Sequence, residues 1–208
     1  MGSHDGCMTQ TPDFRSDLDA AHRWVAELMS GVRPEQLDDT TPCAELDVRA
    51  LLHHFAAHPT KLTAIATGGD PRTIGDSGEI DEKRPAEDYL ARATAALDAW
   101  GDDALLDKSL IAPWGEAPGW MSVGAFLMET MTHGWDLAVA TGQDAEADPV
   151  LVAKAQAIAD QTLSDDYRGP GFPFGERVES STGAGPTERL ANFLGRRRPS
   201  SERDPLSV

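Results

Sequence analysis

The chain has 208 residues, of which 40% are apolar and 25% charged, a composition that suits one globular domain with a sizeable core. Acidic residues outnumber basic ones 35 to 18, and the resulting formal charge of -17 argues against a nucleic-acid partner. No apolar stretch approaches the ~20 residues that a membrane span needs, and the N-terminus lacks a secretory signal. We therefore expect a cytoplasmic protein without a membrane partner. Residues 1–10 are expected to be a leader or cloning remnant.

Apolar residues recur every three or four positions along most of the chain, which is the spacing of amphipathic helices. Proline, glycine and capping residues divide this pattern into segments. In chain order, the predicted helices run from Pro12 to before Gly31, from Val48 to or past Pro59, from Pro85 to about Trp100, from Val123 to about Thr141, from Pro149 to before Gly169, and from Thr187 to Leu194.

Asp47 and Ser122 are expected to cap two of these helices, and Pro59 predicts a kink or an early end in the second. The span 105–121 fits either a loop or a short hairpin. With no convincing alternating strand pattern, the fold class is all-α. We expect one helical domain over residues 11–195 and a disordered polar tail over residues 196–208.

Glu129 and His133 form the most unusual pair in the fourth predicted helix. They are four residues apart, so both side chains project from the same face. That face also carries Phe126 and Leu137, which predicts that it faces the core. Burying a carboxylate and an imidazole costs free energy unless each finds a partner. Either the two residues satisfy each other, or a third group satisfies both.

The second predicted helix carries three histidines, His53, His54 and His58. At about 100° per residue, His58 lies about 80° and His54 about 120° from the centre of the apolar face, while His53 lies about 140° away on the other side. His53 is therefore expected in solvent. His54 and His58 are expected at the edge of the buried face, either as boundary histidines or as metal ligands.

The two helices together offer a set of metal ligands. Helical bundles build metal sites from side chains on facing helices. Two histidines and one carboxylate leave coordination positions open, as in catalytic rather than structural zinc sites. The sequence thus favours a metal site between these helices over two unrelated polar intrusions.

Three segments resemble a known family. Thr41–His54 resembles the signature that opens the metal-bearing helix in the mycothiol-dependent maleylpyruvate isomerase-like branch of the DinB-like proteins, and Glu129–Gly142 is similar to the second signature of that branch. Arg189–Arg196 resembles the closing motif of an actinobacterial subgroup of metal-binding proteins. The resemblance spans nearly the whole chain, from residue 13 to residue 195.

The resemblance implies a DinB-like bundle of four long antiparallel helices with additional short helices and a C-terminal extension. It also implies that His54, Glu129 and His133 bind a divalent metal, most commonly zinc, with nickel or iron as alternatives. A shift of one residue in register would exchange His53 for His54. His58 has no counterpart in the motif, so it is either an extra ligand or an acid/base in the pocket.

Three hypotheses about function follow. In the first, the protein is a metal-dependent transferase or isomerase that activates a small thiol, mycothiol or a similar one, against an electrophilic substrate. In the second, it is a non-catalytic module that binds a metal or sequesters a ligand. In the third, Glu129 and His133 only pair with each other. The sequence leaves open whether the protein forms a homodimer.

Overall fold

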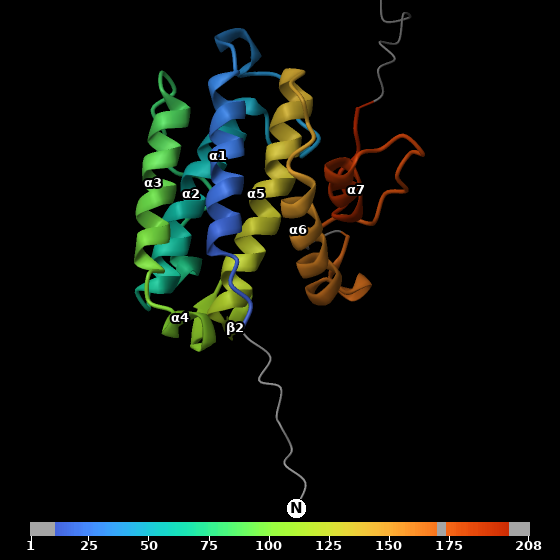
Figure 1. Ribbon diagram of the computed structural model, residues 1–208. Coiled ribbons are helices and arrows are strands. Elements are labelled where there is room, and N and C mark those ends of the chain that lie inside the picture. Colours follow the sequence, from blue (N-terminus) through green and yellow to red (C-terminus); the bar gives the residue numbers. More distant parts are fainter. Residues whose placement is uncertain (1–10, 170–173, 200–208) are drawn as a thin grey trace, which may run out of the picture.

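The computed structural model of the protein describes residues 11–169 and 174–199, and its elements are labelled in Figure 1. The predicted leader and residues 200–208 of the predicted tail lie outside the described residues. The helices are α1 (Arg15–Ser30), α2 (Val48–Ala66), α3 (Pro85–Ala99), α4 (Ala104–Asp107), α5 (Gly119–Thr141), α6 (Pro149–Thr162) and α7 (Pro186–Phe193). Two short strands, β1 (Ser109–Ala112) and β2 (Gly115–Pro118), and three 3-10 turns complete the described chain.

Four long helices form the bundle, in which α1 packs against α3 and α5, and α2 packs against the same two helices. The helices α1 and α5 run in one direction and α2 and α3 in the other (Figure 1). Helix α6 and the short helix α7 cover the outer side of α5. The all-α prediction is therefore confirmed.

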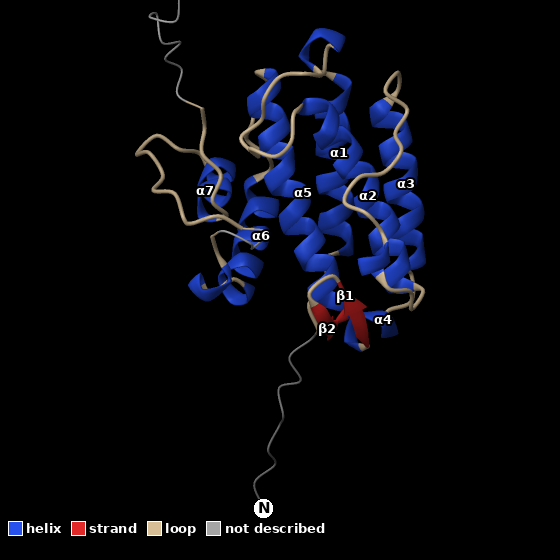
Figure 2. Cartoon of the chain, turned by 180° about the vertical axis from the view of Figure 1, so that it is seen from behind, coloured by secondary structure: helices blue, strands red, loops and turns tan. Residues whose placement is uncertain are grey.

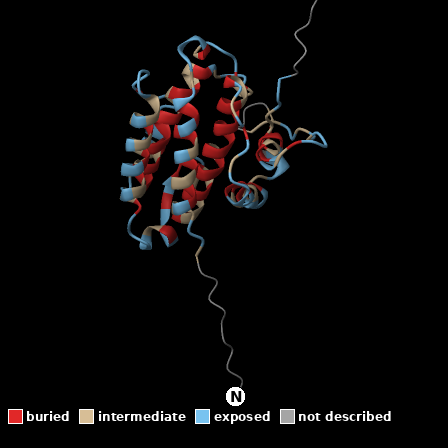
Figure 3. Cartoon of the chain, turned by 45° about the horizontal axis from the view of Figure 1, so that its top comes forward, coloured by how far each residue is buried: buried red, intermediate tan, exposed pale blue. Residues whose placement is uncertain are grey.

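The core fills the space between the four long helices, and the exposed residues lie on their outer faces (Figure 3). Gly134 allows α1 and α5 to approach closely, because a Cβ atom at this position would lie 2.2 Å from the ring of Trp24. The close approach fixes α5 next to His133, one residue earlier in the same helix. Packing against α1 thus positions the part of α5 that carries the predicted site.

The helix α2 begins where the sequence predicts, since the Asp47 side chain accepts a hydrogen bond from the Ala50 amide at 2.7 Å. Pro59 does not end it, and the early end that we considered is wrong. The helix continues to Ala66, because Pro59 is itself buried and apolar residues before and after it, such as Phe55 and Leu62, pack in the core.

The start of α5 also differs from the prediction. The helix begins at Gly119, and Ser122 lies inside it, fully buried, rather than at its cap. The residues before it form the antiparallel hairpin β1–β2, in which Ser109 pairs with Pro118 (Figure 2). The hairpin feeds directly into α5 and leaves no room for a capping loop.

A long connection, residues 67–84, returns along α2 to the start of α3 because these two helices run in the same direction (Figure 2). It is held to α2 by a hydrogen bond from the Gly78 amide to the His53 carbonyl at 2.8 Å. At the other end of the chain, residues 196–199 include the start of the predicted tail, and Arg196 contacts the bundle. Among the described residues, no helix combines the length and the apolar character needed to cross a membrane.

Candidate metal centre

The structure brings together the three predicted ligands, His54 from α2 and Glu129 and His133 from α5. Each offers one ligand atom, and these atoms lie within 4.8 Å of one another. Nε2 of His133 is 3.5 Å from a Glu129 carboxylate oxygen, and the rings of His54 and His133 have centroids 4.8 Å apart. The i, i+4 spacing on α5 sets the first distance, and the packing of α2 against α5 sets the second.

His54 is oriented by the connection that runs along α2. Its Nδ1 lies 2.7 Å from the Asp76 carbonyl oxygen. A carbonyl can only accept a hydrogen bond, so Nδ1 carries the proton and donates it. The remaining nitrogen, Nε2, therefore carries the lone pair that a metal ligand requires, and it lies 3.1 Å from Nε2 of His58.

His133 is oriented in the same way by a carboxylate. Its Nδ1 donates to Asp136 at 3.0 Å, which leaves Nε2 for Glu129 and the interior of the site. Asp136 is fully buried and also accepts a hydrogen bond from Nε of Arg196 at 3.0 Å. Such carboxylate–histidine pairs fix the tautomer of metal-binding histidines in proteins.

His58 lies deeper in the bundle, and its Nε2 is 3.1 Å from Nε2 of His54. Because the His54 nitrogen is the acceptor, His58 donates from Nε2, and its buried Nδ1 has no partner among the residues that the structure describes. His58 is not among the three residues whose ligand atoms lie within 4.8 Å of one another. It therefore adjoins the three-residue set through His54. We refer to His54, His58, Glu129 and His133 as the histidine cluster.

His53 lies on the other side of α2. Its Nδ1 donates to the Gly78 carbonyl at 2.8 Å, and its Nε2 faces Glu82 at 3.3 Å. These contacts occupy both ring nitrogens, and His53 belongs to neither of the two three-residue groups that could hold a metal in the described part of the chain. The structure thus separates the two adjacent histidines as the helical-wheel argument expects, although His53 is held by the connection and is not free in solvent.

The electrostatics of the histidine cluster favour neutral His54 and His58 beside a charged Glu129 carboxylate and its partner His133. Burial lowers the pKa of His54 and, more strongly, that of His58. Burial alone would raise the pKa of Glu129, but its hydrogen bond to His133 and the nearby histidines bring that pKa down to about 2. Burial opposes the charged form of His133, and the hydrogen bonds to Asp136 and Glu129 overcome it and raise its pKa.

These residues fit a divalent metal. Metal–ligand bonds of about 2.0–2.2 Å place two ligand atoms of a tetrahedral site roughly 3.3 Å apart, close to the 3.5 Å between His133 and Glu129. Two imidazoles and a carboxylate are the donors that zinc and other borderline metals take. The Glu129 side chain retains 30% of its exposure, so the cluster is open on one side.

The structure also shows polar residues that the sequence did not assign to the site. Asp136 lies three residues after His133, and this i, i+3 spacing was the available signal. Cys43 offers its sulfur to a second three-residue group with His133 and Asp136. Burial raises the pKa of the Cys43 thiol, and the nearby guanidinium of Arg196 acts in the opposite direction. Neither the Cys43 contact nor the Arg196 contact has a short-range spacing that could reveal it.

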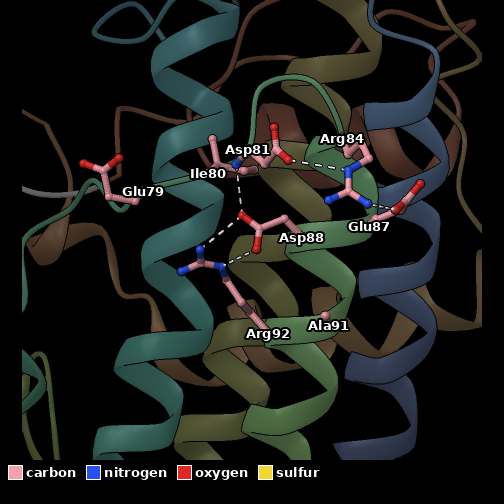
Figure 4. Close-up of a pocket in the computed structure, with 8 residues that line it drawn as sticks. All are labelled: Glu79, Ile80, Asp81, Arg84, Glu87, Asp88, Ala91 and Arg92. Atoms are coloured by element: carbon pink, nitrogen blue, oxygen red, sulfur yellow. Dashed lines mark hydrogen bonds and ion pairs between the residues drawn. The ribbon is translucent and has the colours of Figure 1, made fainter.

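A surface pocket lies elsewhere, along α3 and the end of the preceding connection (Figure 4). Its lining, which we call the α3 cluster, consists of Glu79, Ile80, Asp81, Arg84, Glu87, Asp88, Ala91 and Arg92. The arginines there face carboxylates on the same segment, with Arg92 paired to Asp88 at 2.9 Å and Arg84 to Glu87 at 3.1 Å. The pocket shares no residue with the histidine cluster.

The family model described as the mycothiol maleylpyruvate isomerase N-terminal domain matches residues 18–138. The chain belongs to this family. The match includes His54, His58, Glu129, His133 and Asp136, and it ends before α6, α7 and Arg196. The DinB-like resemblance predicted from the signatures is thus confirmed at the level of the family.

Two curated relatives of this family member are the uncharacterized proteins MT0763 and Rv0738 of Mycobacterium tuberculosis strains CDC 1551 / Oshkosh and ATCC 25618 / H37Rv. Each is 30% identical over 171 residues, which cover 82% of this chain and 91% of the relative. The similarity therefore extends well beyond the 121 residues of the family match (18–138). No solved structure matches the chain.

Proposed function

We propose that this protein binds one divalent metal ion, zinc in the first place, through Nε2 of His54, a carboxylate oxygen of Glu129 and Nε2 of His133. The observation that carries this proposal is the convergence of the three ligand atoms within 4.8 Å, from two helices. Two further contacts support it, because the Asp76 carbonyl and the Asp136 carboxylate each accept a hydrogen bond from Nδ1, so that the lone pair of the neutral ring lies on Nε2.

We further propose that the bound metal serves thiol chemistry, as the name of the family suggests. A divalent metal supplies a positive charge that keeps a coordinated thiol deprotonated at neutral pH, although a free thiol has a pKa near ~8.5. The substrates would be a small thiol of the mycothiol type and a compound with an electrophilic carbon. The thiolate sulfur would add to that carbon as the π electrons of an adjacent multiple bond shift away from it and a proton is taken up, which gives an S-conjugate. Expulsion of the thiolate with loss of that proton would restore the multiple bond and give an isomer.

The residues of this chain have separate tasks in that reaction. His54, Glu129 and His133 would hold the metal, and the thiol and the electrophile would enter on the side where Glu129 is 30% exposed. His58 stays neutral beside the ligands, because burial and the neighbouring His54 ring lower its pKa. The Nε2–H of this neutral ring faces Nε2 of His54, so His58 can orient the His54 ring.

Elemental analysis of the purified protein tests the metal proposal, with close to one zinc, nickel or iron per chain expected. A thiol-dependent assay then tests the chemistry, with mycothiol and maleylpyruvate as the first pair and a general alkylating electrophile as the second. Consumption of the electrophile that requires both thiol and metal supports an enzyme. Metal without such turnover favours a binding module, and protein that resists metal loading under reducing conditions contradicts the whole proposal.

A further inference from the structure

The chain after α7 turns back towards the candidate metal centre. The helix ends at Phe193, the Gly195 amide donates to the Asn192 carbonyl at 3.0 Å, and the Arg196 amide donates to the Ala191 carbonyl at 2.8 Å. These two bonds form a Schellman turn, which reverses the chain at a helix C-terminus. The Asn192 side chain fixes the turn by donating to the Arg196 carbonyl at 2.9 Å.

Gly195 makes this turn possible. Its φ angle is +89°, a conformation that residues with a side chain rarely adopt. A Cβ atom at this position would also lie 2.6 Å from Cα of Gly175, so the neighbouring backbone leaves no space for one. The direction of the Arg196 side chain is therefore set by the backbone of α7 and by the segment that packs on it.

Arg196 reaches the centre through Asp136. Its Nε donates to Oδ2 of Asp136 at 3.0 Å, and the same oxygen accepts a hydrogen bond from Nδ1 of His133 at 3.0 Å. The Asp136 side chain is 0% exposed and that of Arg196 is 13% exposed. A carboxylate at this depth is costly unless it is paired with a cation, and Arg196 is the arginine or lysine that contacts it among the described residues.

We infer that Arg196 is a positioning residue of the metal centre: it anchors Asp136, and Asp136 holds the His133 ring with Nε2 towards the ligand set. This inference rests on the proposed function and extends the site beyond residues 18–138, which the family model matches. The C-terminal turn then completes the centre, although it contributes no ligand. Without Arg196, the Asp136 carboxylate loses its cationic partner, and the His133 ring loses an acceptor held in a fixed position. Metal binding must then also order the His133 ring, which lowers the metal affinity.

Arg196→Met tests this directly, with Arg197→Met as the matched control. Arg197 is the next residue, is exposed, and makes no ion pair within the described part of the chain. We expect Arg196→Met to raise the zinc dissociation constant about 10- to 100-fold, the range typical for partners of metal-binding histidines. Competition with a chromophoric chelator measures it. Arg197→Met should match the wild type, and Arg196→Lys should recover part of the loss.

A second readout separates positioning from a structural ion pair. Long-range proton–nitrogen NMR of the metal-free protein, recorded at a pH high enough that the His133 ring holds a single proton, reports which nitrogen carries it, and wild type should show Nδ1–H alone. Arg196→Met should give a mixture of tautomers. Gly195→Ala, which keeps the guanidinium but strains the turn, should reproduce both effects. These experiments are made on chains whose helical circular dichroism equals that of the wild type.

The outcomes distinguish this inference from the proposed function. If the wild type binds zinc and Arg196→Met binds it within twofold of Arg197→Met, Arg196 does not position the site and the proposed metal centre stands. A lower melting temperature with unchanged affinity and tautomer would likewise reduce Arg196 to a structural role and overturn the inference. If the wild type binds no metal, both the inference and the proposed function fail.

Discussion

The bundle carries two clusters of ionisable side chains that differ in how their groups are paired. In the α3 cluster each arginine faces a carboxylate at the surface, as Figure 4 shows for Arg84 and Arg92. These partners lie within four residues of each other along the chain. Each arginine is already paired locally and the exposed carboxylates are solvated, so the α3 cluster needs no further partner.

The histidine cluster is built in the opposite way. Its groups come from two helices, are buried or half-buried, and include a buried nitrogen, Nδ1 of His58, that has no partner among the described residues. Unpaired polar groups in a core cost free energy, whereas surface ion pairs contribute little. The difference teaches that buried, incompletely satisfied donors and acceptors are a stronger reason to propose a site than a high density of charge.

The largest expected effect comes from replacing each of the two adjacent histidines of α2 in turn. His54→Ala should abolish metal binding, because it removes one of three convergent ligands, while His53→Ala should leave the metal content near one per chain. Elemental analysis after dialysis measures both. If His53→Ala is the variant that loses the metal, the assignment of the two α2 histidines is wrong.

Glu129→Gln should remove most of the stabilisation that metal provides. A ligand present at 1,000 times its Kd and bound only to the folded state adds about 4 kcal/mol to the free energy of unfolding. Melts with and without chelator should therefore differ strongly for the wild type and only slightly for Glu129→Gln. Equal chelator shifts in the two proteins would show that Glu129 is not a ligand and pairs only with His133.

A third prediction concerns acid stability and a buried histidine outside the histidine cluster. Burial lowers the pKa of His22 from 6.5 to about 4, and Nδ1 of His22 is hydrogen-bonded to the Tyr89 hydroxyl. The unfolded chain therefore binds a proton that the folded chain excludes between these values, and stability falls as the pH decreases from 6.5 to 4. The difference between the two pKa values corresponds to a loss of about 3 kcal/mol in the free energy of unfolding.

His22→Gln removes the titration and keeps a hydrogen-bonding side chain. In denaturant unfolding of the metal-free protein, the fall in stability between pH 6.5 and 4 should be smaller in this variant by about one proton's contribution. Identical pH profiles of the variant and the wild type would contradict the lowered pKa of His22.

His58→Gln should have an intermediate effect on the metal. The variant keeps an N–H that can donate to His54 but loses the buried ring, so we expect metal affinity to fall by about tenfold, or 1.4 kcal/mol. Isothermal titration with zinc measures it. Complete loss of binding would instead make His58 a fourth ligand, and no change would make it a bystander.

The smallest effect is expected in the α3 cluster. Arg92→Ala removes a surface ion pair with Asp88 and should change the free energy of unfolding by no more than about 0.5 kcal/mol. Metal content and metal affinity should equal those of the wild type. A loss of metal in this variant would break the distinction between the two clusters.

The sequence by itself determined most of the helices and the local part of the site. Apolar periodicity and the Asp47 cap placed α2, and the four-residue spacing of Glu129 and His133 set them on one face of α5. These features could be predicted because they depend on helical geometry over a few residues, which is the same in every helix. The start of α5 and the hairpin before it had no such periodic signal.

Only the tertiary structure decided which groups orient the histidines. The Asp76 carbonyl reaches His54 because the 67–84 connection must return along α2 between two parallel helices, and backbone carbonyls carry no sequence signature. Arg196 meets Asp136 across 60 residues, through the turn at Gly195. Such contacts arise from the packing of whole elements, and no local spacing encodes the direction in which two distant segments approach each other.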